Sequence, residues 1–201
     1  MAFTYFFRDM QTLEMIRDYA IPALRTKRHI KVWDAGCAMG PEPYSLAIIL
    51  RENMGNMIFR NVNIFATDID GSNLFQKIIE SGEYPRDQLD RIPKDIFYKY
   101  FAKVDGSDRY KISDEMIKSI NFFRHDLLSL KPVSHDFGLV MCKNVLLHFT
   151  YEERINVIKM FHDNLIDGGY FVSEQTQKMP VELENYFEQV VPNAQIYRKV
   201  I

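Results

Sequence analysis

The sequence predicts an α/β fold in which a doubly wound, mostly parallel sheet carries helices on its faces. The first observation is the apolar run 30–33, which is followed by a turn with two glycines and then by apolar residues at helical spacing. This order of strand, glycine turn and helix opens a nucleotide-binding βα unit. The second observation is the run 137–142, which is apolar throughout, as in a strand buried on both faces. Strands that alternate with helices pair in parallel.

The N-terminal part predicts a helical segment over residues 3–29, because its apolar residues recur at helical spacing. Pro22 is expected to limit this helix, since proline lacks the N–H that the helix interior needs. The first strand is expected at 30–35 and the first core helix at 43–54, with Gly55 as its stop.

A second strand is expected at 62–67, closed by the acidic turn 68–70. A helix should follow, which starts at 71–73 and ends at 81–85. Two short helices are expected after it, near 86–91 and 94–101. The region 102–125 breaks the alternation, because the turn cluster 105–108 separates two extended stretches. We therefore expect a small β-hairpin subdomain here. Residues 117–123 are either a further strand of that subdomain or a main-sheet strand that leads to Asp126.

The alternation then resumes with the strand at 137–142. Thr150 and Glu153 have the spacing of a capping box for a helix over 151–162. A strand at 170–173, a last helix near 180–189 and a terminal strand near 194–200 complete the prediction. We interpret residues 1–201 as a single domain.

Composition excludes several classes of protein. The chain has 201 residues, of which 47% are hydrophobic and 26% charged, which suits one globular domain. A net charge of −2 gives no electrostatic case for nucleic-acid binding. No apolar run approaches the ~20 residues that span a bilayer, and no signal pattern is present. Cys37 and Cys142 lack CxxC spacing, which argues against a disulfide framework or a metal site and favours the cytoplasm.

The carboxyl ends of the expected strands should meet in one crevice, where such sheets bind ligands. The turn from Gly36 to Gly40 is not G-x-G-x-x-G, and the chain has no Walker lysine, so a phosphate cradle is not indicated. Gly36 can still let backbone approach a ligand. Asp68 can accept hydrogen bonds from both ribose hydroxyls, which suits a nucleoside without phosphates such as S-adenosylmethionine. The alternative for Asp68 is a helix-cap aspartate, a role that Asp70 fills equally well.

Five short motifs lie in order along most of the chain: TYFFR at 4–8, GPEPYS at 40–45, ATDID at 66–70, MCKNV at 141–145 and DGG at 167–169. They resemble the T-x-F-F-R, G-E-E-P-Y-S, A-S/T-D-I-D, C-R-N-V and D/P-G-G motifs of the chemotaxis receptor methyltransferases, the CheR family. The resemblance implies a class I S-adenosylmethionine-dependent methyltransferase fold. It also implies transfer of the methyl group to glutamate side chains of a protein substrate, the cytoplasmic region of a chemoreceptor.

The same resemblance implies roles for individual residues. The residues expected to hold S-adenosylmethionine are Thr4 and Arg8 at its methionine end, Glu42 at its methionine or ribose part, Asp68 at its ribose, Asp126 and Leu127 beside its adenine, and Asn144 and Val145 after a strand. Those expected near the transfer site are Arg8, Lys143 and His148. An ionised carboxylate is already a nucleophile at pH 7, so no general base is required.

Several features depart from the family pattern. The chain is expected to lack the helical domain that usually precedes T-x-F-F-R and is associated with docking on the receptor. The sequence does not reveal whether another chain supplies such a domain. Lys143 replaces an arginine and His148 a tyrosine, and His148 is equally explained as a partly buried core histidine. The hairpin tip at 105–108 is short, and residues 37–39 replace a more polar loop. Two alternatives therefore stay open: a related enzyme with another carboxylate acceptor, and a non-catalytic module that binds S-adenosylmethionine. The sequence leaves the oligomeric state undecided.

Overall fold

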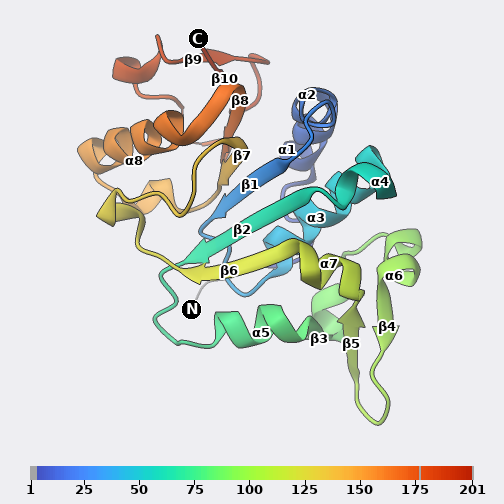
Figure 1. The fold of residues 1–201 in the computed structure, drawn as a ribbon. Coiled ribbons are helices and arrows are strands. Elements are labelled where there is room, and N and C mark those ends of the chain that lie inside the picture. The colour runs from blue at the N-terminus through green and yellow to red at the C-terminus, as the bar shows by residue number, and fades with distance from the viewer. Residues whose placement is uncertain (1–3, 177, 201) are drawn as a thin grey trace.

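The computed structural model describes residues 4–176 and 178–200, which form a seven-stranded sheet flanked by helices (Figure 1). The strand order is β6-β2-β1-β7-β8-β10-β9. The first five strands are parallel, and β10 pairs antiparallel with both of its neighbours, β8 and β9. This topology confirms the doubly wound, mostly parallel sheet. The strands are β1 (Ile30–Ala35), β2 (Val62–Asp68), β6 (Ile120–Arg124), β7 (Phe137–Cys142), β8 (Leu165–Ser173), β9 (Phe187–Gln189) and β10 (Ile196–Lys199).

The strand order reverses direction between β1 and β7, its two central strands. From β1 the chain proceeds outward through β2 to β6, and it then returns to the other side of β1 at β7. Helices that begin after these two strands leave toward opposite faces, which opens a crevice at the carboxyl ends. All six residues of β7 are buried, as its apolar run predicts.

Helices cover both faces of the sheet, with α8 on one side and α1, α2 and α3 on the other (Figure 1). The helices are α1 (Met10–Met15), α2 (Ile21–Leu24), α3 (Pro41–Met54), α4 (Asn56–Phe59), α5 (Phe75–Ser81), α6 (Lys94–Tyr100), α7 (Asp114–Ser119) and α8 (Tyr151–Asn164). Shorter helical turns are η1 (Ile16–Ala20), η2 (Arg86–Leu89), η3 (Leu127–Ser129), η4 (Leu146–His148) and η5 (Val181–Leu183).

Strand β1 contributes alternate residues to two hydrophobic cores. Val32 belongs to the core under α3, whereas Trp33 and Ala35 belong to the core under α8. Side chains alternate between the faces of a strand, so Asp34 points to the α3 side. This polar side chain at the end of an apolar strand becomes important at the site below.

The expected end of the N-terminal helix at Pro22 is wrong, because α1, η1 and α2 form one continuous helix up to Leu24. Element η1 is a π-turn, in which the N–H of Ile21 donates to the carbonyl of Ile16, five residues earlier. The wider turn shifts the hydrogen-bond register directly before the proline ring and accommodates it. Phe3, the first residue of the expected segment, lies outside the described residues.

A second sheet is small and antiparallel, with β5 (Arg109–Ile112) between β3 (Glu83–Pro85) and β4 (Phe101–Lys103). Its β4–β5 hairpin is the one expected around 105–108. The sheet differs from the expected range 102–125 at both ends. At one end it includes β3, which was expected to be the end of a helix. At the other end β6 does not belong to it, because β6 pairs with β2 at the edge of the main sheet.

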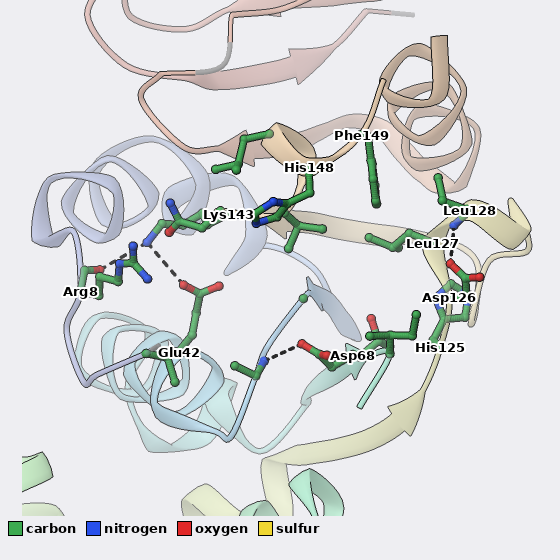
Figure 2. A pocket seen from close by; sticks show the side chains of 18 residues that line it. Arg8, Glu42, Asp68, His125, Asp126, Leu127, Leu128, Lys143, His148 and Phe149 are labelled. Carbon is green, nitrogen blue, oxygen red and sulfur yellow. Dashed lines mark hydrogen bonds and ion pairs between the residues drawn. The ribbon is translucent and has the colours of Figure 1, made fainter. Parts of the chain in front are cut away.

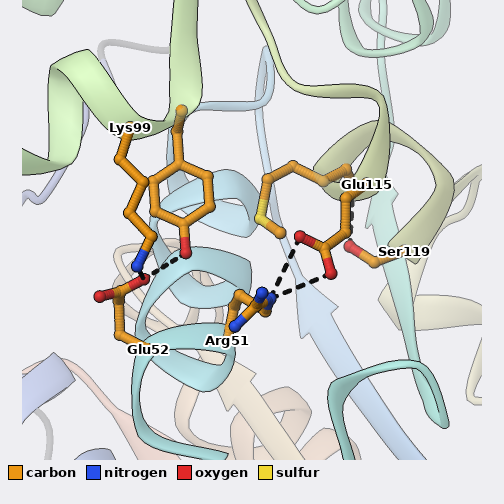
Figure 3. A network of polar contacts seen from close by, with 7 residues as sticks. Arg51, Glu52, Lys99, Glu115 and Ser119 are labelled. Carbon is orange, nitrogen blue, oxygen red and sulfur yellow. Dashed lines mark hydrogen bonds and ion pairs between the residues drawn. The ribbon is translucent and has the colours of Figure 1, made fainter. Parts of the chain in front are cut away.

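The small sheet and its helices are tied to the C-terminal end of α3 by a polar network (Figure 3). Arg51 Nε lies 3.0 and 3.1 Å from the two carboxylate oxygens of Glu115 on α7. Lys99 Nζ on α6 lies 2.6 Å from Glu52 Oε1, which also accepts a hydrogen bond from the hydroxyl of Tyr100. Every side chain of this network has a partner.

In the C-terminal part, one predicted helix is wrong and one predicted capping box is confirmed. Residues 180–189 do not form a helix, because 187–189 pair with β10 as strand β9 and only the turn η5 precedes them. The capping box of Thr150 and Glu153 is present and starts α8, which ends at Asn164, two residues beyond the expected end. Across 4–176 and 178–200, the structure contains no helix with the length and apolar character that crossing a membrane requires.

Candidate functional site

A cavity of about 580 Å³ opens at the carboxyl ends of β1, β2, β6 and β7 (Figure 2). It is lined by all the residues to which the sequence analysis assigns a role: Thr4, Arg8, Gly36, Glu42, Asp68, Asp126, Leu127, Lys143, Asn144, Val145 and His148. They come from segments far apart in the chain, so the cavity brings them together as one site. Their individual roles stay predictions.

The turn after β1 shapes one wall of the cavity. Gly36 has φ +95°, and a Cβ at this position would lie 2.1 Å from Val145 Cγ2, so only glycine fits. The N–H groups of Gly36 and Cys37 donate to the carbonyl of Thr67 at 2.7 and 3.0 Å. The turn is therefore fastened to the end of β2 and packs closely against the segment after β7.

Asp68 and Asp70 lie in different surroundings, which bears on the ribose and helix-cap alternatives for Asp68. Asp70 is 2% exposed, and its carboxylate accepts hydrogen bonds from the N–H groups of Leu74 and Phe75 at the start of α5. Asp70 is thus the helix-cap residue. Asp68 is half-buried at the cavity wall, where it accepts hydrogen bonds from the N–H of Ala38 at 2.9 Å and from that of Asp70 at 3.2 Å.

Lys143 lies at the centre of a buried ionic cluster (Figure 2). Its side chain is 1% exposed, and its Nζ lies 3.6 Å from Glu42 Oε2 and 3.7 Å from Asp9 Oδ2. The same ammonium donates a hydrogen bond to the carbonyl oxygen of Arg8 at 3.3 Å. A charge can be buried when it is paired in this way. The cluster joins the N-terminal segment, α3 and the loop after β7.

The segment that carries Arg8 has an unusual backbone. Phe7 and Asp9, on either side of Arg8, both have φ 56°, a left-handed conformation that L residues rarely adopt. The N–H of Phe7 donates to Ser45 Oγ at 2.8 Å, and this hydroxyl donates to the carbonyl of Pro41 at 2.6 Å. The strained segment is therefore clamped to the first turns of α3, with Arg8 lining the cavity.

Asp34 and Glu42 form a carboxyl pair beneath the cavity. Asp34 is fully buried in β1, and the two side chains lie within hydrogen-bonding reach of each other. Burial first, and then the nearby Glu42, raises the pKa of Asp34 well above its usual range. Burial also raises the pKa of Glu42, against the opposing effect of Lys143. Glu42 was predicted from the sequence as a site residue, whereas Asp34 was not.

The opposite wall is more apolar. Leu127 is buried in η3, where Asp126 Oδ1 accepts a hydrogen bond from the N–H of Leu128 at 2.9 Å. His125 and Phe149 also line this part, and the sequence analysis missed both. They lie directly next to the singled-out Asp126 and His148, so adjacency in sequence was the available signal. The remaining cavity residues that it missed are Ala38, Thr67, Ile69, Leu128 and Leu147.

The segment after β7 completes the cavity rim. Asn144 has φ 57°, and its N–H donates to Glu174 Oε2 at 3.1 Å, which holds the turn in place. His148 follows in η4 and is exposed at the rim. The interpretation of His148 as a partly buried core histidine therefore does not describe its position.

The donor set fits S-adenosylmethionine better than a phosphorylated nucleotide. Asp68 offers carboxylate lone pairs to ribose hydroxyls, and Leu127 offers an apolar surface to a purine. Glu42 Oε1 is buried and finds no hydrogen-bond donor among the residues that the structure describes, so it can receive a cationic group of a ligand. The buried lysine of the site is already paired, which leaves it poorly suited to binding phosphate.

Comparison with known proteins agrees with this chemistry. The family model described as "CheR methyltransferase, SAM binding domain" matches residues 2–196. The "Chemotaxis protein methyltransferase" of Borreliella burgdorferi is 32% identical over 84% of this chain and 62% of its own length. The protein of the same description from Listeria innocua is 34% identical over 82% of this chain and 60% of its own length. The chain thus spans about three fifths of the length of these relatives.

Among solved structures, the magnesium protoporphyrin IX methyltransferase of Synechocystis with bound SAM is 15% identical, with a TM-score of 0.49. The match covers 94% of this chain and 78% of that one.

Proposed function

The chain belongs to the CheR methyltransferase family, and from this premise we propose that it methylates glutamate side chains of a chemoreceptor or a similar protein. Its cofactor is S-adenosylmethionine, the ligand after which the matched domain is described. The observation that carries the proposal is the cavity, where residues from four strand ends and the N-terminal segment converge.

Within this proposal, Asp68 holds the ribose, because its carboxylate lies at the cavity wall while Asp70 takes the capping role. Leu127 lies beside the adenine, and Glu42 faces the amino-acid end of the cofactor. Gly36 lets the backbone approach, since no side chain fits between it and Val145. Together these residues hold the cofactor and exclude water from it.

When bound, S-adenosylmethionine supplies a methyl group on a sulfonium, which an ionised glutamate carboxylate can accept directly. The chain's task is then to align the attacking carboxylate, because the acceptor needs no general base at pH 7. Arg8 suits this task, since a guanidinium binds a carboxylate with two parallel hydrogen bonds. His148 is exposed at the rim, where it can line the acceptor channel. Lys143 supports the wall through its three oxygen contacts.

The test is transfer of a tritiated methyl group from S-adenosylmethionine to a chemoreceptor cytoplasmic fragment. We expect base-labile label on the fragment, as a glutamate methyl ester gives. Arg8→Lys should lower the rate of methyl transfer by roughly tenfold or more, because lysine cannot form two parallel hydrogen bonds to a carboxylate. Arg17→Lys is the matched control, since Arg17 pairs with Asp18 on the surface, outside the cavity lining.

Two results would redirect the proposal. Absence of label, with S-adenosylhomocysteine demonstrably bound, would point to another carboxylate acceptor or to a non-catalytic binding module. Label that survives alkali would contradict ester formation itself.

A further inference from the structure

Asp34 occupies an unusual place for an acidic residue. It lies in the inner strand β1, between Ala66 of β2 and Met141 of β7, both of which are fully buried. Asp34 itself has no exposed surface. An unpaired carboxylate in such surroundings carries a large desolvation cost, so a buried acid of this kind takes up a proton instead.

The groups that face Asp34 come from every element around it. Glu42 on α3 lies within hydrogen-bonding reach, and after burial it contributes most to raising the pKa of Asp34. The other charged or titratable groups that act on it are Lys143 after β7, Asp68 at the end of β2, and the buried thiols of Cys37 and Cys142. Lys143 is the only cation among these groups, and it is already paired with Glu42 and Asp9.

Three oxygen atoms of this pair have no hydrogen-bond donor within the described part of the chain. They are Asp34 Oδ1, Asp34 Oδ2 and Glu42 Oε1. Buried acceptors of this kind are rare in folded proteins and call for an explanation. A single proton on Asp34 accounts for two of the three, because its O–H can then donate to Glu42 Oε1 in a strong acid–carboxylate hydrogen bond.

We propose that Asp34 is a positioning residue of the cofactor site, a neutral carboxylic acid whose O–H donates to Glu42 and aims that carboxylate at the amino-acid end of S-adenosylmethionine. The proposal rests on the proposed role of Glu42. Lys143 holds the other oxygen of Glu42 at 3.6 Å, so the carboxylate is fixed from two sides. Glu42 also lies in the first turn of α3, where the helix dipole favours its negative charge.

Infrared spectroscopy of the intact chain tests the proton directly. A protonated carboxyl group has a C=O stretch that is distinct from the stretches of carboxylates. We expect this band in the wild-type protein at neutral pH and its loss in Asp34→Asn. Glu174 is a second buried acid whose pKa is raised, chiefly by burial, so Glu174→Gln is the matched control and should keep the Asp34 band.

Calorimetric titration with S-adenosylhomocysteine tests the positioning role. Asparagine keeps a donor for Glu42, so Asp34→Asn should bind within about threefold of the wild type. Asp34→Ala removes the donor and should bind roughly tenfold or more weakly, the effect of losing one hydrogen bond to a charged group. Asp34→Leu fills the space without a donor and should bind as weakly as Asp34→Ala, whereas a purely packing role would let leucine restore binding.

Two outcomes would overturn the proposal. One is a set of infrared spectra in which Asp34→Asn loses no protonated-carboxyl band that the wild type and Glu174→Gln both show. The other is equal affinity of the wild type, Asp34→Asn and Asp34→Ala. If Asp34→Ala does not fold, the infrared comparison of the wild type with Asp34→Asn decides alone. Neither measurement uses a methyl acceptor, so failure here is distinguishable from failure of receptor methylation.

Discussion

Helix α3 carries acidic side chains at both ends, and their surroundings differ sharply. At its C-terminal end, Glu52 is partly exposed and is paired with Lys99 and Tyr100. At its N-terminal end, Glu42 is almost fully buried, and one of its two oxygens has no donor within the described residues. One end is a completed network, whereas the other is complete only with a proton or a ligand.

This difference separates structural from functional polar groups. Partly exposed ion pairs contribute little free energy and mainly hold elements in register, as Arg51 and Glu52 hold α6 and α7. Buried polar groups that lack a hydrogen-bond partner cost free energy of folding, and they are found where a ligand binds to them. The comparison assigns the N-terminal end of α3 to the site and the C-terminal end to the scaffold.

Breaking the buried cluster should have the largest effect. Lys143→Met leaves Glu42 and Asp9 without their cation, so the free energy of unfolding should fall by about 3–5 kcal/mol. Lys99→Met at the other end of α3 should cost about 0–1 kcal/mol. Guanidinium denaturation of both variants measures the contrast, and equal losses would remove the distinction between the two ends.

The next effect concerns binding. Glu42→Gln removes the negative charge that is expected to face the cofactor, so affinity for S-adenosylhomocysteine should fall by about ten- to a hundredfold. Glu52→Gln is the matched substitution at the scaffold end and should leave affinity unchanged. Calorimetry on both variants provides the comparison, and a loss of affinity only in Glu52→Gln would reverse our assignment.

A third prediction concerns pH. Because the pKa of Asp34 is raised in the folded state, the folded protein keeps a proton that the unfolded chain releases above about pH 4. The contribution of Asp34 to the free energy of unfolding of the wild type therefore decreases as pH rises. In Asp34→Asn this pH-dependent contribution is absent. Between pH 5 and pH 8 the Tm of Asp34→Asn should rise relative to the wild type by at least about 2 °C, the shift that 1 kcal/mol produces at this size.

Thermal scans of both proteins across this pH range measure the difference. If the difference in Tm between the wild type and Asp34→Asn is the same at every pH, Asp34 carries no extra proton in the folded state.

The smallest effect is expected at the scaffold network. Arg51→Met removes the contact with Glu115, which is partly exposed, and should cost about 0.5–1 kcal/mol. Affinity for S-adenosylhomocysteine should not change, because the network lies at the far end of α3 (Figure 3). A large loss of affinity in a folded Arg51→Met protein would show that the two ends of the helix are coupled.

Local patterns in the sequence predicted the strands and helices whose own residues determine them. The all-apolar run of β7, the glycine turn at Gly36 and the capping box at Thr150 each specify local structure, and all three are present. The predicted site residues also share one cavity, because strand ends of a parallel sheet converge.

Features that depend on distant partners escaped the sequence analysis. Residues 187–189 form a strand only because β10 lies beside them. Similarly, 83–85 form one only through pairing with β5. The contact of Asp34 with Glu42 needs the strand, the turn and the helix to be placed together, so the spacing of eight residues did not reveal it.

The most direct test of the cofactor site is calorimetric titration of the intact chain with S-adenosylhomocysteine, beside Asp68→Ala. We expect one molecule bound per chain. In Asp68→Ala the affinity should fall at least about a hundredfold, because two hydrogen bonds from ribose to a charged carboxylate are lost. Circular dichroism establishes that the variant is folded. No binding by the wild type, or equally tight binding by folded Asp68→Ala, would contradict the assignment of this cavity.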